Sequence, residues 1–164
     1  MTSRRRKLLI AAKVDKADRD YFEAEIRPLL KGPWVEFIGE IGEAEKNDFL
    51  GGADALLFPI DWPEPFGLVM IESLACGTPV VAYRRGSVPE VIDDGRTGFL
   101  VDDEDEALAA LDRIGSIDRA ECRRTFEKRF SAERMAADYV ELYARAAAAA
   151  ERRYAAEAAD ERAA

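Results

Sequence analysis

Short, almost unbroken apolar runs alternate along this chain with longer segments whose apolar residues recur at helical spacing. The runs are too short for helices, and glycine or proline borders most of them, so they predict strands. The predicted strands are residues 7–12, 34–39, 55–58, 79–83 and 99–101, and the first of them is expected to be fully buried. The predicted helices are residues 18–30, 43–50, 67–75, 104–114 and 118–128, a short one within 86–92, and a long one from Ala132 onward.

This alternation predicts an α/β fold. Strands that are apolar on both faces are typical of a parallel sheet with helices on both sides. Right-handed crossovers then give a single Rossmann-like, three-layer domain. We expect that domain to span residues 7–145, followed at 146–164 by an Ala/Glu/Arg-rich helical tail that has almost no apolar face and is either exposed or docked on a partner.

Ligands of such sheets bind at the carboxyl ends of the strands, so the loops that follow the strands are the candidate binding regions. Lys13 and residues 61–67 and 84–90 occupy these loops. In the second of them, Glu64 is separated by seven residues from Glu72, which lies inside the helix expected to begin near Gly67. The first amides of a helix lack intrahelical partners and carry the positive end of its dipole, so they attract anions. Two acids beside an anion site suggest a ligand with phosphates and hydroxyls, such as a sugar nucleotide.

Each residue of this segment also has a purely structural interpretation. Glu72 lies among apolar residues, so it is either an acceptor for vicinal hydroxyls such as those of a ribose, or the salt-bridge partner of Lys13 or Arg84. Glu64 is either a ligand contact or an acid that stabilises the helix N-terminus. Gly67 either supplies backbone freedom or lets a ligand approach the backbone.

Two neighbouring features carry similar alternatives. Trp62 is expected as a packed lid over its loop, with stacking on a ligand ring as the alternative. Arg84 and Arg85 end a strand at the ligand edge, where they either neutralise phosphate or form a solvated pair.

Composition narrows the classes of function. The chain has 164 residues, 48% of them apolar, and a formal net charge of −9. These numbers suit one globular domain and argue against nucleic acid or an anionic membrane as the main partner. The basic run at residues 4–7 is expected to be a solvated tail, and no apolar stretch approaches the roughly 20 residues of a membrane span.

The reactive side chains limit the chemistry further. Cys76 and Cys122 are far apart in sequence and are expected to be buried thiols in a reducing cytosol, without a zinc site. The chain has no histidine, so a general base must be Asp, Glu, Tyr, Lys or Cys, or must come from another chain.

Taken in order, several motifs resemble those of a known family. The chain resembles the donor-binding C-terminal half of GT-B glycosyltransferases of glycosyltransferase family 4, the retaining group 1 type. The motifs that carry this resemblance are residues 37–39, 53–59, 64–72, 75–82, 86–92 and 95–101. The resemblance covers most of residues 7–145, which it implies to be a nucleotide-sugar-binding domain.

The resemblance assigns roles to the matching positions. Glu64 is implied to be catalytic and to hold hydroxyls of the donor sugar, while Glu72 takes the ribose and Gly39 and Ile41 seat the base. The donor-sugar and phosphate site is implied to comprise Glu64, Pro65, Phe66, Gly67, Leu68, Val69 and Lys13. No metal and no cofactor is expected, since helix amides and basic side chains meet the charge of the leaving diphosphate.

The sequence departs from the family pattern in two respects. It has room for only one of the two Rossmann-like halves, and the G-R-x4-K-G stretch that clamps the diphosphate is not found ahead of residue 7, so Lys13 would have to supply part of that charge. We therefore expect a cytoplasmic protein that supplies the donor-binding half of a retaining glycosyltransferase and has little turnover on its own.

The expected donor is a UDP-, GDP- or ADP-sugar, and the acceptor is an unknown hydroxyl compound. A separate N-terminal half is a candidate partner, and peripheral contact with the inner membrane through that half is a further hypothesis. The alternative function is a non-catalytic nucleotide-sugar-binding module or a subunit of a split enzyme.

Overall fold

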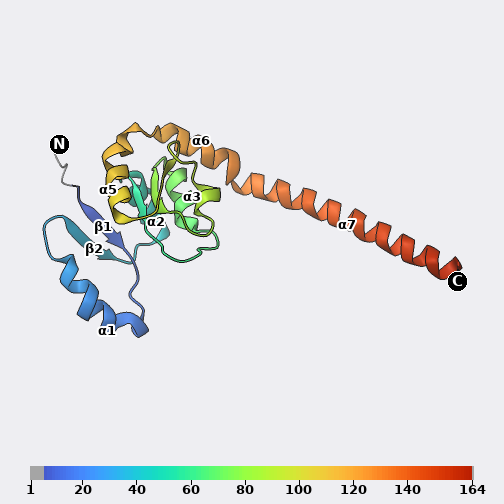
Figure 1. The fold of residues 1–164 in the computed structure, drawn as a ribbon, viewed down its shortest axis with the longest axis horizontal. Helices are drawn as coiled ribbons and strands as arrows, with labels where there is room; N and C mark the ends of the chain where they lie inside the picture. Colours follow the sequence, from blue (N-terminus) through green and yellow to red (C-terminus); the bar gives the residue numbers. More distant parts are fainter. Residues whose placement is uncertain (1–5, 164) are drawn as a thin grey trace.

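The computed structural model describes residues 6–163, and the side chains of residues 6–153. It is an α/β fold from which one long helix extends (Figure 1). The strands are β1 (Leu8–Ala11), β2 (Val35–Gly39), β3 (Leu56–Phe58), β4 (Val80–Tyr83) and β5 (Gly98–Val101). The α-helices are α1 (Arg19–Tyr21), α2 (Glu43–Gly51), α3 (Leu68–Ala75), α4 (Val88–Val91), α5 (Glu104–Arg113), α6 (Arg119–Arg129) and α7 (Ala132–Ala163). The shorter helical turns are η1 (Lys16–Asp18), η2 (Phe22–Ile26), η3 (Arg27–Leu30) and η4 (Ile114–Ser116).

All strand pairs are parallel, which confirms the predicted α/β class. The strands form two sheets within the described residues, one of β1 and β2 and one in the order β3-β4-β5. The predicted single layer is therefore divided between β1 and β3. Among residues 6–163, each of these two strands has a hydrogen-bonded neighbour on one side only.

The prediction that residues 7–12 form a fully buried strand was wrong. Leu8 and Leu9 of β1 are 39% and 42% exposed. An apolar run shows that a strand can be buried, but its burial depends on neighbours along both edges and on both faces. Because β1 has a strand on one edge only, its leucines remain accessible.

The predicted helix at residues 18–30 is present as a series of short turns of different types. The amide of Arg27 donates to the carbonyl of Phe22, five residues back, which is π-helical spacing. Pro28 has no amide hydrogen and cannot make the next α-helical bond, so the segment continues as the 3₁₀ turn η3. The ring of Phe22 packs against Phe37 of β2, with the ring centroids 5.1 Å apart.

The core lies between the three-stranded sheet and the helices that cover it. Met70 and Leu74 of α3, Val80 of β4 and Cys122 of α6 are completely buried. Burial raises the pKa of the Cys122 thiol to about 11. Both cysteines are free thiols as expected, but the expected burial was wrong for Cys76, which is only half-buried because it lies at the end of α3. The buried face of α3 fixes this helix against the sheet, so its N-terminal end is held at the carboxyl edge of β3.

Helix α7 leaves this body as a single rod (Figure 1). Its first turns expose apolar side chains, among them Met135, Tyr139 and Val140. Residues 146–153 are mostly exposed, as expected for the tail, and the Tyr154 side chain lies outside the described residues. Arg4 and Arg5 of the predicted solvated tail also lie outside them. No helix among the described residues is both long and apolar enough to cross a membrane.

Candidate functional site

The loop from β3 to α3 is built around the side chain of Glu64. One carboxylate oxygen accepts a hydrogen bond from the indole Nε1 of Trp62 at 3.0 Å, and the other accepts one from the amide of Gly67 at 3.2 Å. The Glu64 carboxylate is half-buried, and Gly67 is the residue immediately before α3. Glu64 therefore takes the structural role predicted for it, that of an acid beside the helix N-terminus, and its bond to Trp62 also fixes the loop.

Gly67 is required by the backbone of this loop. Its φ is +72°, and an added Cβ would lie 3.2 Å from the ring of Phe58 and 2.7 Å from the methyl carbon of Met70. A left-handed backbone in close contact with core side chains restricts this position to glycine. The geometry thus supports the backbone interpretation of Gly67.

The start of α3 is accessible. Phe66 and Leu68 are 42% and 64% exposed, and Pro65 is exposed as well. Pro65 has no amide hydrogen, and the Gly67 amide donates to Glu64. The amides of Leu68 and Val69 in the first turn of α3 lack intrahelical partners and remain donors for a ligand. Such donors, together with the helix dipole, favour an anionic ligand.

A second loop supports Glu64 from behind. Gly86 has a φ of +51°, and a Cβ there would lie 2.3 Å from the carbonyl oxygen of Glu64. The amide of Ser87 donates to that same carbonyl at 2.9 Å. The sequence analysis did not assign this role to Gly86; the only signal was its place in a loop at the same sheet edge.

Glu72 has a partner that the sequence analysis missed. Its carboxylate accepts a hydrogen bond from Lys46 Nζ of α2 at 3.0 Å. The same ammonium lies 2.8 Å from Glu43. Its hydrogen bond to Glu43 is the main reason that the pKa of Lys46 is raised, and its hydrogen bond to Glu72 raises this pKa further. The expected salt bridge of Glu72 with Lys13 or Arg84 was wrong, because α2 lies beside α3 and brings its own lysine.

The basic residues singled out from the sequence are paired with acids. Lys13 Nζ lies 3.3 Å from Asp15, with both side chains exposed. Arg85 Nε donates to Asp61 at 2.9 Å, and Arg84 Nε is 3.8 Å from Asp102. Each arginine thus has a carboxylate partner on a neighbouring loop, and both side chains remain partly exposed.

Trp62 is not the packed lid that was expected. Its side chain is 58% exposed, and its indole nitrogen is used by Glu64. An exposed ring held by one hydrogen bond at the ligand edge keeps a face available for stacking.

The remaining predicted residues lie at the end of the other sheet. Gly39 closes β2 with a φ of +77°, and its carbonyl accepts from the amide of Ala12 at 2.9 Å. Ile41 is half-buried just ahead of α2, the helix whose Lys46 reaches Glu72. The structure thus brings Glu64, Gly67 and Glu72 together on one loop and helix, and links the Gly39–Ile41 segment to them through α2.

The donor set fits an anionic organic ligand better than a metal ion. Among the described residues, no group of three or more His, Cys, Asp or Glu side chains is arranged to hold a metal. Accessible helix amides, two half-buried carboxylates and an exposed tryptophan instead offer contacts to phosphate, hydroxyl groups and a ring.

Comparison with known proteins gives the family. The family model for glycosyl transferases group 1 matches residues 2–129. The chain therefore belongs to the glycosyl transferases group 1 family.

Individual relatives agree with this assignment. D-inositol 3-phosphate glycosyltransferase of Streptomyces scabiei is 43% identical over 76 residues, which cover 46% of this chain and 17% of that protein. The crystal structure of AviGT4, a glycosyltransferase involved in avilamycin A biosynthesis, matches with a TM-score of 0.69 and 30% identity over 87% of this chain and 44% of AviGT4. Anabaena Alr3699/HepE in complex with UDP-glucose shares the fold, with a TM-score of 0.72 and 21% identity over 84% of this chain and 40% of that one. The chain thus spans less than half the length of each of these proteins.

Proposed function

We propose that this chain supplies the donor-binding part of a retaining glycosyltransferase that moves a sugar from a nucleotide diphosphate to an acceptor hydroxyl. The observation that carries the proposal is the Glu64–Gly67–α3 arrangement, in which a fixed carboxylate stands beside the accessible amides of a helix N-terminus. Membership of the group 1 family and the UDP-glucose complex of Alr3699/HepE support a nucleotide sugar as the ligand.

In this proposal the diphosphate binds at the start of α3. The amides of Phe66, Leu68 and Val69 donate to its oxygens, while that of Gly67 donates to Glu64. The helix dipole stabilises the charge that develops as the sugar leaves. Electrostatic stabilisation of this kind needs no metal ion, so we propose metal-independent transfer.

The two glutamates take different parts of the donor. Glu64 accepts hydrogen bonds from hydroxyls of the sugar, and Glu72, with its second oxygen free of the Lys46 hydrogen bond, accepts from the ribose. Gly39 and Ile41 border the base, and Lys13 contributes positive charge at the same edge. The free thiols of Cys76 and Cys122 fit a reducing compartment such as the cytoplasm.

The partial coverage of its relatives makes a second function worth testing. A chain that binds the donor but lacks the acceptor side would act as a nucleotide-sugar-binding module or as one subunit of a split enzyme. Catalysis needs both reactants held in one geometry, so binding and transfer are separable here.

Calorimetric titration with UDP-, GDP- and ADP-sugars tests the proposal. We expect saturable binding of one of them, weakened about 5- to 100-fold by Glu72→Ala, since truncation leaves ligand hydroxyls unpaired at a cost of about 1–3 kcal/mol. Glu43→Ala is the matched control, because it removes the other partner of Lys46 and leaves Glu72 in place. Absence of binding at millimolar nucleotide sugar would contradict the proposal. Sugar transfer that appears only after a candidate N-terminal partner is added would identify a split enzyme.

A further inference from the structure

The guanidinium of Arg85 contacts the loops that follow three neighbouring strands. Arg85 lies in the loop after β4, and its Nε donates to the carboxylate of Asp61, after β3, at 2.9 Å. Its Nη1 donates to the backbone carbonyl of Arg84 at 3.2 Å and lies 3.9 Å from the carboxylate of Asp102, after β5. Contacts on both sides hold the planar guanidinium in one orientation, so it joins the loop of Asp61 to the loops after β4 and β5.

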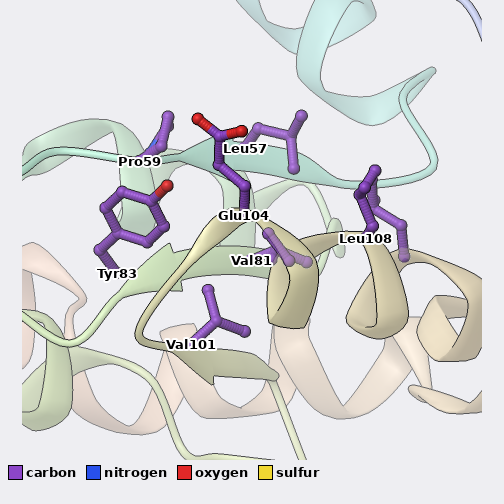
Figure 2. A pocket seen from close by; sticks show the side chains of 9 residues that line it. Leu57, Pro59, Val81, Tyr83, Val101, Glu104 and Leu108 are labelled. Carbon is purple, nitrogen blue, oxygen red and sulfur yellow. The ribbon is translucent and has the colours of Figure 1, made fainter.

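The ends of β3 and β4 provide a packed base for this contact. Pro59, directly after β3, and Tyr83, the last residue of β4, line the same apolar cavity (Figure 2). The amide of Arg85 donates to the carbonyl of Tyr83 at 2.8 Å, so Arg85 follows the strand in a tight turn. Asp61 comes two residues after Pro59. Both partners of the ion pair are therefore close to strand ends that are held in place.

Asp61 is directly followed by the residue that holds Glu64. The indole of Trp62 donates to the Glu64 carboxylate at 3.0 Å, and the amide of Glu64 donates to the carbonyl of Trp62 at 2.8 Å. Pro63 lies between them, and its fixed φ stiffens this short turn. A displacement of Asp61 would therefore carry Trp62 with it and change the direction of the Glu64 carboxylate.

From these contacts, we propose that Arg85 is a positioning residue for Glu64. By holding Asp61 it orients Trp62, and Trp62 in turn orients the Glu64 carboxylate. The side chains of Arg85 and Asp61 are 38% and 74% exposed, and an exposed ion pair contributes little to overall stability, so the effect is local to the loop. Its consequence for ligand binding rests on the proposed function, in which Glu64 contacts the donor sugar.

The indole N–H signal of Trp62 in a ¹H–¹⁵N NMR spectrum reports this orientation directly. Its chemical shift depends on the hydrogen bond to Glu64, and the Glu64→Ala protein gives the position of the signal without that bond. We expect Arg85→Ala to move the signal at least about half of the way toward this position, because the bond weakens as its geometry is lost. Arg84→Ala is the matched control, because it keeps the pair of Arg85 with Asp61, and it should leave the signal in place.

Exchange of the two charges makes the test specific to the ion pair. Asp61→Arg and Arg85→Asp should each move the Trp62 signal, whereas the double variant should return it toward the parent position. If Arg85→Ala does not fold, Asp61→Asn breaks the same pair at an exposed position and carries the same comparison. An unchanged Trp62 signal in the folded variants that lack the pair would overturn the inference. Shifts that simply add in the double variant would overturn it as well.

Ligand binding separates this inference from the proposed function. For a nucleotide sugar that binds the parent protein, Arg85→Ala should weaken binding about 3- to 10-fold, while Arg84→Ala leaves it unchanged. The thermal midpoint should stay the same in both variants. Equal binding by Arg85→Ala and the parent would overturn the role of Arg85 at the site. Absence of binding by the parent would contradict the proposed function instead, and the Trp62 signal would still test the orientation of Glu64.

Discussion

The ammonium of Lys46 joins Glu43 on its own helix to Glu72 on the neighbouring helix α3, at 2.8 Å and 3.0 Å. This relationship turns the Glu72 carboxylate toward α2 and fixes one of its two oxygens. It also connects the segment after β2 to the helix that carries the candidate donor site.

Replacing Lys46 with alanine should therefore affect ligand binding more than folding. The pair is partly exposed, so its loss should leave the unfolding transition nearly unchanged. Release of the Glu72 carboxylate should weaken binding of the cognate nucleotide sugar about 2- to 10-fold, the value of one hydrogen bond. Calorimetry and thermal unfolding measure the two effects, and Glu43→Ala should alter neither. A Lys46→Ala protein that binds as tightly as the parent would show that Lys46 does not orient Glu72.

The contact between Gly86 and Glu64 predicts a steric effect on the site. Gly86→Ala places a Cβ in a left-handed backbone and against the Glu64 carbonyl, so either the loop moves or the strain is retained. We expect a loss of about 1–3 kcal/mol in unfolding free energy beyond that of Gly95→Ala. Gly95 has a similar φ of +73° but open space around it, so it isolates the cost of backbone strain from that of the clash. Urea denaturation compares the two variants. Equal losses of unfolding free energy would mean that the close approach of Glu64 to position 86 adds no cost of its own.

The buried thiol predicts a pH dependence of stability. Burial raises the pKa of Cys122 from its ordinary value of 9.0 to about 11. Between these values the unfolded chain releases the proton and the folded chain retains it, so the unfolding free energy should fall as pH rises from 9 to 11. Cys122→Ala should remove this part of the slope, and Cys76→Ala should keep it. At pH 8, iodoacetamide should label the half-buried Cys76 readily and Cys122 only after unfolding; rapid labelling of both would contradict the burial of Cys122.

Helix α7 predicts a tail that can be removed. Side chains of residues 146–153 contribute little buried area, so a chain ending at Arg145 should keep the thermal midpoint of the full chain within a few degrees. Circular dichroism should show a lower helix signal with an unchanged unfolding transition. A large drop in the midpoint would place the tail within the folded core instead.

Features that depend only on residues close together in the sequence could be predicted, whereas those that depend on contacts between elements could not. Strand β4 and helix α3 follow from apolar runs bounded by Gly77 and Pro79, and both formed as predicted within a residue. The end of the irregular segment before β2 also followed from local chemistry, because Pro28 removes one amide. These features need only the residues that form them.

The rest depended on how elements meet. The sequence placed Glu72 inside a helix, but only the docking of α2 beside α3 selects Lys46 over Lys13 as its partner. The exposure of Leu9 could not be predicted, because burial of an apolar run depends on the strands beside it. Likewise, Gly86 is required by the return of its loop to Glu64, which no sequence spacing reveals.

The central claim is that the N-terminus of α3 binds the diphosphate of a nucleotide sugar, with Glu64 and Glu72 on either side. The most direct measurement is an NMR titration of the ¹⁵N-labelled chain with UDP-glucose, with glucose alone as the control. We expect saturable chemical-shift changes of the Gly67, Leu68 and Val69 amide signals with UDP-glucose, and no such changes with glucose. Saturable shifts confined to other parts of the chain, or no shifts at millimolar UDP-glucose and equally none with GDP- and ADP-sugars, would contradict it.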